Sequence, residues 1–117
     1  MSSSLYQLTR KAENDFREII RASQSDFGNQ AAIRYKRLIL VALREIANDP
    51  KLQGHREFEG IAYLYHIRYS SKRASMDSIK VRNPRHFVVY RILKSGIIEI
   101  TRILHERMDL PNRLREE

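Results

Sequence analysis

A β-hairpin near the C-terminus constrains the fold of this chain more than any other part of its sequence. Residues 87–93 (FVVYRIL) and 97–104 (IIEITRIL) are rich in β-branched and aromatic side chains, as strands are. Between them, Lys94-Ser95-Gly96 forms a three-residue loop whose glycine can adopt a positive φ. These features predict two adjacent antiparallel strands.

Alternation along the second strand of this hairpin predicts how its side chains divide between the faces of the sheet. Successive side chains of a strand point to opposite faces. Ile98, Ile100 and Leu104 are therefore expected to share one face. Glu99 and Thr101 are expected on the opposite face.

Two amphipathic helices are predicted before the hairpin. Thr9 is a suitable N-cap, and apolar side chains at helical spacing follow it over about residues 10–25. A second apolar helical repeat runs from Tyr35 to Ile46 and covers more than one face, so something besides the sheet is expected to pack against it. Because only a short break at Gly28 separates the two segments, we expect an antiparallel helix hairpin.

The rest of the chain completes the expected fold. Residues 5–9 and residues 61–69 (IAYLYHIRY) predict two further strands, whereas residues 70–85 are polar and basic without a period and predict a long loop. The order is that of an α+β fold in one domain spanning residues 1–117. It consists of an N-terminal strand, an antiparallel helix hairpin, an antiparallel β-meander of about three strands and a short C-terminal helical tail.

The chain is basic, with 22 Lys and Arg residues against 14 Asp and Glu residues and a net charge of +8. This balance predicts a nucleic acid, an anionic membrane or an acidic protein surface as a partner. Most of the excess lies between His66 and Arg91, interleaved with aromatic residues. That pattern is typical of a nucleic-acid surface, and a solvated loop beside ordinary strand aromatics also explains it. The basic side chains of the expected loop are Lys72, Arg73, Lys80, Arg82 and Arg85.

The sequence contains no motif of a metal or phosphate site. It has no cysteine, which excludes disulfides and thiolate chemistry, and its four histidines lack metal-ligand spacing. Its four glycines are scattered, not gathered in a phosphate-binding loop. No metal or cofactor is therefore predicted. No apolar run approaches the roughly 18 residues of a membrane span and no signal peptide is recognisable, so a cytoplasmic location is expected.

Acid–base chemistry on RNA is a further hypothesis, since it requires only a base, an acid and a cation near the phosphate. Side chains that converge across adjacent strands would supply these groups. The alternative is that they have structural roles, such as His105 at a strand end or Arg91 paired with an acid. The candidate set is His66, Arg68, Tyr90, Arg91 and His105.

Four stretches of the sequence resemble one protein family. They are the opening Leu8–Phe16 (LTRKAENDF), Val89–Ile92 (VYRI), Ile98–Ile100 (IEI) and Arg102–Leu110 (RILHERMDL). Together they are similar to the toxins of the RelE/ParE superfamily, and most closely to the ParE branch. The resemblance covers nearly the whole chain, and its most specific part is the tail RILHERMDL.

The resemblance implies a toxin of a type II toxin–antitoxin system that binds and inhibits DNA gyrase and so blocks replication and growth, without a catalytic residue of its own. RelE-like relatives share the fold but cut messenger RNA on the ribosome, commonly with a His-Tyr ending that this chain lacks. The ParE-like sequence after His105 favours gyrase, with the ribosome-dependent endoribonuclease as the alternative. The long segment 70–85 departs from compact members, which leaves the target open at that point. The residues expected to contact the target are Arg91, Arg102, His105, Met108, Asp109 and Leu110.

The resemblance also implies a cognate antitoxin with a flexible, acidic C-terminal segment that wraps around the toxin. Such a segment suits a basic chain, because coupled folding buries apolar groups while its acids meet arginines. We expect the docking surface on the helix hairpin, and the alternative is that its apolar members belong to the core. The surface comprises Phe16, Ile20, Tyr35, Ile39 and Leu43, with Arg17, Arg34 and Arg37 at its rim.

Overall fold

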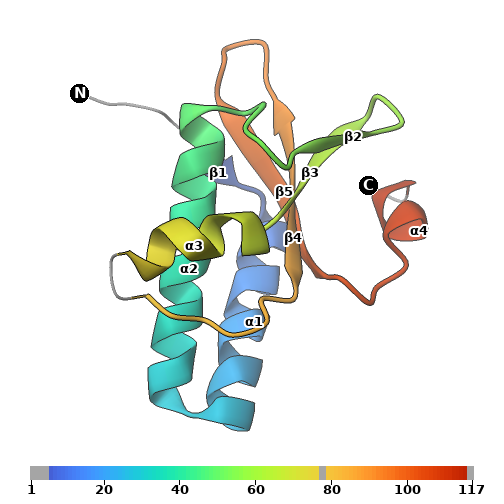
Figure 1. Ribbon diagram of the computed structural model, residues 1–117. Helices are drawn as coiled ribbons and strands as arrows, with labels where there is room; N and C mark the ends of the chain where they lie inside the picture. Colours follow the sequence, from blue (N-terminus) through green and yellow to red (C-terminus); the bar gives the residue numbers. More distant parts are fainter. Residues whose placement is uncertain (1–5, 77–78, 116–117) are drawn as a thin grey trace.

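Helices cover one face of a five-stranded sheet in the computed structural model, which describes residues 6–76 and 79–115 (Figure 1). In chain order the elements are β1 (Tyr6–Leu8), α1 (Arg10–Phe27), α2 (Asn29–Asn48), β2 (Arg56–Phe58), β3 (Ala62–His66), α3 (Arg68–Ser75), β4 (His86–Ile92), β5 (Ile98–His105) and α4 (Leu110–Arg115). The strand order across the sheet is β1-β5-β4-β3-β2. α1 and α2 form the helical layer, and α4 lies on the other side of the sheet.

The predicted helix hairpin is confirmed. Thr9 Oγ1 accepts a hydrogen bond from the backbone N–H of Ala12 at 3.1 Å, which caps the start of α1. Gly28 joins α1 to α2 with a φ of +91°, a conformation that residues with a Cβ rarely adopt. α2 packs against α1, α3 and the sheet, which accounts for its apolar residues beyond a single face.

The sheet is mixed. β2, β3, β4 and β5 follow one another in antiparallel order, and β1 pairs in parallel with β5. The helix hairpin leads from β1 to β2 at the opposite edge of the sheet, so β1 and its parallel partner β5 are joined through all the elements between them. The α+β class and the order of the predicted elements are confirmed. β2 adds a strand to the expected meander, and its short, charged sequence (REF) carries no apolar alternation by which to predict it.

A β-bulge changes which side chains of β5 face the helices. β4 and β5 lose register between Val89 and Tyr90, where Thr101 is left over on β5. Ile100 therefore lies in the core beneath the helices, whereas Leu104 lies in a core on the opposite face. The expectation that these two side chains share a face is wrong, because a one-residue insertion reverses the alternation beyond it.

The bulge is also where α1 attaches to the sheet. Thr9 Oγ1 donates a hydrogen bond to the carbonyl of Thr101 at 2.9 Å, and the backbone N–H of Thr9 donates to the carbonyl of Ile100 at 3.0 Å. The hydroxyl of Thr101 in turn donates to the carbonyl of Val89 at 3.2 Å. The capping residue of the first helix is thereby fixed to the last strand, 92 positions away in sequence.

The loop expected over residues 70–85 is wrong for its first part, which belongs to α3. Ser70 and Ala74, one helical turn apart, are fully buried. Ser70 Oγ donates a hydrogen bond to Glu45 Oε1 of α2 at 2.6 Å, and Arg73 Nη2 donates to the same oxygen at 2.7 Å. Long-range contacts therefore stabilise this short helix, whose own sequence is polar.

A second, smaller core lies on the sheet face opposite the helix hairpin. Leu64, Val89 and Leu104 form it together with Leu114 of α4. The predicted C-terminal helix is thus confirmed, and it covers part of this face (Figure 1). Among the residues described, no helix has the length and apolar character needed to cross a membrane.

Candidate functional site

Three strand ends meet at one end of the sheet and gather histidines there. His66 ends β3, His86 begins β4 and His105 ends β5. In the antiparallel register His86 pairs with His105, and His66 pairs with Phe87. The ring centroids of His86 and His105 are 5.1 Å apart in an edge-to-face arrangement. We call this group, with the partners described next, the histidine cluster; its members are His66, His86, His105, Tyr35, Arg85 and Glu106.

Tyr35 of α2 determines which ring nitrogen of His86 carries the proton. Its hydroxyl accepts a hydrogen bond from the backbone N–H of Arg85 at 2.9 Å and lies 2.6 Å from His86 Nδ1. Burial raises the pKa of Tyr35 to about 12, so the hydroxyl keeps its proton and donates it to His86. Burial lowers the pKa of His86 from 6.5 to about 4. At neutral pH His86 is therefore uncharged, with its proton on Nε2.

Glu106 is the acidic centre of the cluster. It accepts a hydrogen bond from His66 Nε2 at 2.8 Å and another from Arg85 Nη1 at 3.0 Å. These two bonds lower the pKa of Glu106 from 4.5 to about 2. The backbone N–H of Arg68 donates to His66 Nδ1 at 3.1 Å, which leaves the proton on Nε2 for Glu106. Burial lowers the pKa of His66, which favours the neutral imidazole. That form makes both hydrogen bonds, since Nδ1 accepts from Arg68 and Nε2 donates to Glu106.

This arrangement anchors the start of the C-terminal segment. His66 is only 2% exposed, and the backbone N–H of Glu106 donates to the carbonyl of Arg85 at 2.8 Å. Within the described part of the chain, no three His, Asp or Glu side chains are grouped so as to hold a metal ion. The cluster therefore sets the direction in which residues 106–109 leave the sheet.

The structure does not assemble the side chains proposed for acid–base chemistry. Tyr90 is fully buried under the helices, where its hydroxyl donates to the carbonyl of Pro50 and its pKa is raised well above the usual value by burial. Arg91 pairs with Glu99 towards the β4–β5 turn, at the far end of β4 from the histidine cluster. Neither side chain reaches the histidines.

The remaining candidates of that set are also separated. His66 follows Leu64 on the face of the second core, whereas His105 lies on the helix-covered face beside His86. Arg68 lies at the start of α3, with its guanidinium 5.0 Å from the ring centroid of Tyr69. The hypothesis that these residues converge on one substrate is wrong, because the pleat and the burial of the sheet place them apart.

Arg102, predicted to contact a target, has a structural partner instead. Its Nε and Nη2 donate to the carboxylate of Asp15 in α1 at 2.8 and 3.0 Å, and the Arg102 side chain is 14% exposed. The backbone N–H of Ile103 donates to the same carboxylate at 2.9 Å. These bonds join α1 to β5 just beyond the bulge, so Arg102 has little surface to offer a partner.

The other predicted target residues, Arg91 apart, lie together at the end of β5 and directly after it. Met108 is 39% exposed and Asp109 is exposed, whereas Leu110 packs against the second core. His105 is half-buried at the base of this segment. These residues are therefore close together, on a segment whose first residue, Glu106, is hydrogen-bonded within the histidine cluster.

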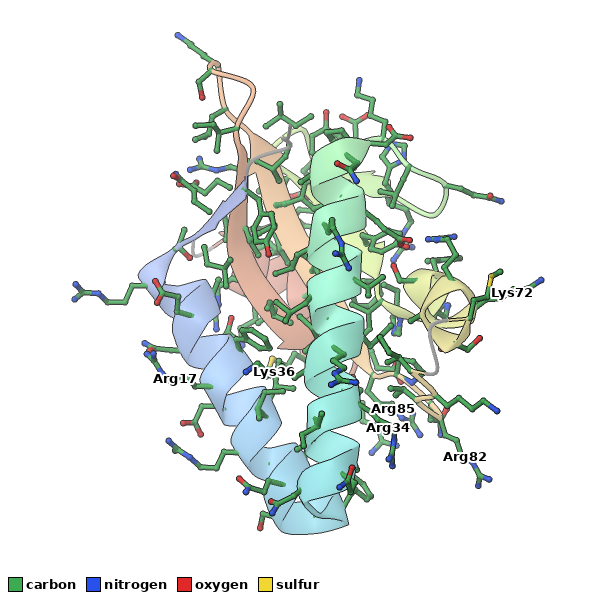
Figure 2. The ribbon with its side chains drawn as sticks, turned by 90° about the vertical axis from the view of Figure 1, so that its left-hand side faces the viewer. Arg17, Arg34, Lys36, Lys72, Arg82 and Arg85 are labelled. Atoms are coloured by element: carbon green, nitrogen blue, oxygen red, sulfur yellow. The ribbon has the colours of Figure 1, made fainter. Side chains whose placement is uncertain are left out.

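The predicted antitoxin surface divides between core and surface. Ile39 and Leu43 are fully buried in the main core, so their assignment to a docking surface is wrong. They lie on the side of α2 that packs against the sheet. Phe16 and Ile20 are half-buried, and Tyr35 is a member of the histidine cluster. The rim cations Arg17, Arg34 and Arg37 are exposed. Figure 2 shows Arg17 and Arg34 on opposite sides of the helix hairpin.

Two apolar side chains near the tip of the hairpin are exposed but were not predicted as a site. Phe27, at the end of α1, is 76% exposed and Ile33, in α2, is 46% exposed.

Glu106 was also not predicted as a site residue, although the sequence contained a signal for it. The predicted meander brings the end of one strand next to the start of the next, so an acid directly after His105 had to lie near His66 and Arg85.

Comparison with known proteins bears on the whole of this arrangement. The family model described as "ParE toxin of type II toxin-antitoxin system, parDE" matches residues 6–110. The chain belongs to the ParE toxin family. The matched region runs from β1 to the first residue of α4 and so includes the complete sheet, the helix hairpin and the histidine cluster. The resemblance on which the sequence prediction rested is therefore confirmed.

Structural similarity supports the ParE fold independently. A solved structure described as "Chromosomal ParDE TA system from P. aeruginosa" has a TM-score of 0.65 and 17% sequence identity. The alignment covers 86% of this chain and 94% of that chain. Among curated proteins, none matches the sequence significantly. At this identity the likeness establishes a common fold for the two chains.

Proposed function

We propose that this ParE-family toxin inhibits DNA gyrase by binding it through the segment that follows β5. The observation that carries the proposal is the contrast along this segment. Glu106 is fixed by hydrogen bonds from both His66 and Arg85, and two residues later Met108 is 39% exposed. An apolar side chain presented from a rigid base is typical of a contact residue in a protein interface.

Inhibition by contact agrees better with these side chains than cleavage of RNA does. A general base or acid must reach the proton that it transfers. Tyr90 and His66 are buried, and the ring of His105 packs edge-to-face against His86. An endoribonuclease would need groups that meet at the surface, which this set does not supply.

We also propose that a cognate antitoxin neutralises the toxin through a flexible, acidic segment. Exposed Arg34 and Arg37 suit carboxylate partners, and the exposed Phe27 and Ile33 suit the apolar side of a segment that folds on binding. The proposed target acts on chromosomal DNA, so the site of action is the cytoplasm.

A supercoiling assay with a matched pair of methionine variants tests the gyrase proposal. We expect the purified toxin to block supercoiling by gyrase while a translated messenger RNA stays intact. Met108→Ser should require at least about tenfold more protein for the same inhibition, the loss of a typical interface contact. Met76→Ser is the control, because Met76 is 82% exposed and lies at the end of α3. Cleaved RNA with unaffected supercoiling would reject the proposal.

Co-expression tests the antitoxin proposal. We expect the product of the adjacent gene to restore growth when expressed with the toxin. The double variant Arg34→Gln and Arg37→Gln should weaken this rescue, whereas Arg10→Gln with Lys94→Gln should not, although both variants remove two exposed positive charges. Equal rescue of the two double variants would contradict the proposed role of the α2 arginines.

A further inference from the structure

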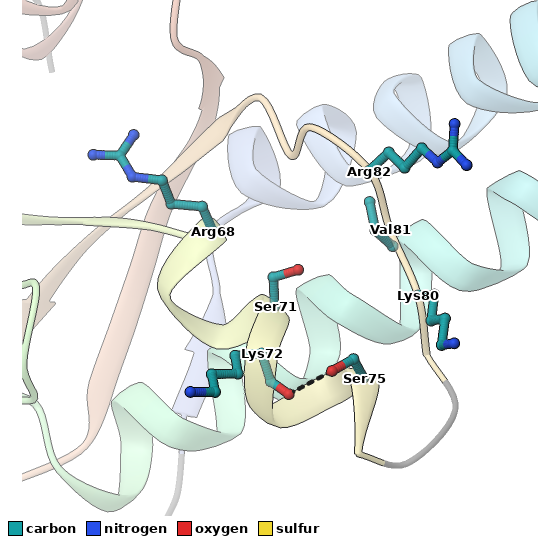
Figure 3. Close-up of a pocket in the computed structure, with 7 residues that line it drawn as sticks. All are labelled: Arg68, Ser71, Lys72, Ser75, Lys80, Val81 and Arg82. Atoms are coloured by element: carbon teal, nitrogen blue, oxygen red, sulfur yellow. Dashed lines mark hydrogen bonds between the residues drawn. The ribbon is translucent and has the colours of Figure 1, made fainter.

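A shallow hollow of about 500 Å³ separates α3 from the segment that returns to β4 (Figure 3). Arg68, Ser71, Lys72 and Ser75 line it from α3, and Lys80 and Arg82 line it from the returning segment. None of the described residues that line it is acidic. We call it the basic hollow. Neither the proposed gyrase contact nor the proposed antitoxin surface uses it.

Among the described residues, three cations of the basic hollow lack an acidic partner. Among residues 6–76 and 79–115, no hydrogen bond or ion pair joins Lys72, Lys80 or Arg82 to an acid, and all three are exposed. Arg73, on the same short helix, is by contrast paired with Glu45 at 2.7 Å. Like charges gathered on one surface repel one another, and an anionic partner relieves that repulsion.

The directions of the side chains indicate an extended anion. In Figure 3 the four cations project outwards from the rim, while Ser71 and Val81 lie between the two walls. A single phosphate or carboxylate is bound by donors that converge on it. Cations that diverge over a surface instead match charges repeated along a polymer. Figure 2 shows that Lys72 and Arg82 lie on the same side of the molecule as Arg34, which lengthens the basic surface.

We infer that the basic hollow is a docking surface for the phosphodiester backbone of double-stranded DNA, bound without regard to sequence. Duplex DNA carries one negative charge per about 1.7 Å of its axis, and Lys and Arg bind it by displacing condensed counterions. The serine hydroxyls add donors of the kind that contact phosphate oxygens. An acidic peptide fits less well, because a segment that folds on docking needs apolar pockets. Of the described residues that line the hollow, Val81 alone is apolar.

A single-stranded nucleic acid also fits less well. Such ligands stack their bases on exposed aromatic rings. Tyr69 lies next to Arg68, but its ring is occupied by the Arg68 guanidinium at 5.0 Å and by Gly54. A Cβ at Gly54 would come within 2.7 Å of Tyr69 Cδ2, so the ring packs directly on that backbone. Tyr69 is 41% exposed, but these two contacts reduce the ring area on which a base could stack, and none of the described residues that line the hollow is aromatic.

The inference does not depend on gyrase as the target, and binding by the purified full chain tests it directly. Fluorescence anisotropy with a short labelled DNA duplex is measured between about 50 and 200 mM salt, where each phosphate contact changes the salt dependence by about one unit of log–log slope. The test variant is Lys72→Gln with Lys80→Gln and Arg82→Gln. The control is Lys51→Gln with Lys94→Gln and Arg10→Gln, which removes the same charge from exposed positions outside the hollow.

We expect the test variant to bind at least about tenfold more weakly at low salt and to lose about three units of slope, while the control changes affinity by less than about threefold. Thermal unfolding of both variants establishes that they fold. Equal binding by the two variants would overturn the inference, as would the absence of duplex binding by the unmodified protein. Displacement of the duplex at lower concentration by single-stranded DNA, duplex RNA or polyglutamate would assign the hollow to that ligand and overturn the choice of DNA.

Discussion

The histidine cluster and the basic hollow are neighbours in the chain, since His66 belongs to the first and Arg68 to the second. Both are rich in ionisable groups. In the cluster every group is held by another: Tyr35 donates to His86, and His66 and Arg85 donate to Glu106. Around the hollow, Lys72 and Lys80 project into solvent without an acidic partner among the described residues. Ionisable groups that satisfy one another maintain the fold, and those that do not are available to a partner.

The largest effect is expected where a paired charge joins two elements. Arg102→Ala leaves the Asp15 carboxylate partly buried without its guanidinium, which should reduce the free energy of unfolding by about 3–5 kcal/mol. Urea denaturation measures it. Arg10→Ala, at an exposed position of α1, is the control and should change little. A loss of stability below about 1 kcal/mol would show that the Arg102–Asp15 pair contributes no more than an exposed ion pair does.

A smaller loss is expected inside the histidine cluster. Tyr35→Phe keeps the ring but removes the donor to His86 and the acceptor for the Arg85 N–H. Leaving such groups unsatisfied should cost about 1–3 kcal/mol in urea denaturation. Tyr69→Phe is the matched control, since the Tyr69 hydroxyl takes part only in a long, exposed contact of 3.4 Å with Arg68. Equal stability of the two variants would show that the buried network contributes nothing.

Acid should weaken the same cluster. Because burial lowers the pKa of His86 from 6.5 to about 4, the unfolded chain binds more protons than the folded chain between these values. The free energy of unfolding should therefore be highest above pH 6.5 and fall as pH decreases towards 4. The Glu106 carboxylate adds a further loss from about pH 4.5 down to 2. Denaturation across this range should show a smaller decrease above pH 4 for His86→Gln; an identical decrease would contradict the assignment.

The smallest effect on stability is expected at the basic hollow. Replacing Lys72, Lys80 and Arg82 by glutamine removes exposed cations that have no acidic partner among the described residues. The free energy of unfolding should therefore stay within about 0.5 kcal/mol or rise slightly. Thermal and urea denaturation give this value. A destabilisation above about 1 kcal/mol would mean that these cations support the fold, which would remove the distinction between the two regions.

The helix hairpin and the β4–β5 hairpin were predictable because their determinants are local. Thr9 and Gly28 act on the backbone beside them, and Gly96 closes a turn between adjacent strands. The family tail after His105 was equally readable, because it is a continuous sequence. In each case the residues that decide the structure lie within a few positions of the structure they decide.

What escaped prediction depends on residues far away in sequence. α3 is stabilised by hydrogen bonds from Ser70 and Arg73 to Glu45 of α2. The polar sequence of α3 does not predict these bonds. The bulge at Thr101 inserts a single residue that no alternation pattern reveals. The candidate acid–base set failed for a related reason, since whether a polar side chain such as Tyr90 is buried depends on the packing of the helix layer.

The hydrogen bonds from Thr9 to the β5 bulge have a consequence for synthesis of the toxin. They close a loop of 92 residues, and β1 finds its partner strand only at Ile98–Ile100. Contacts of such long sequence separation form late and slow down folding. A nascent chain therefore cannot complete the sheet until β5 has left the ribosome, and the segment with Met108 follows β5. We expect each molecule to stay harmless until that segment has left the ribosome.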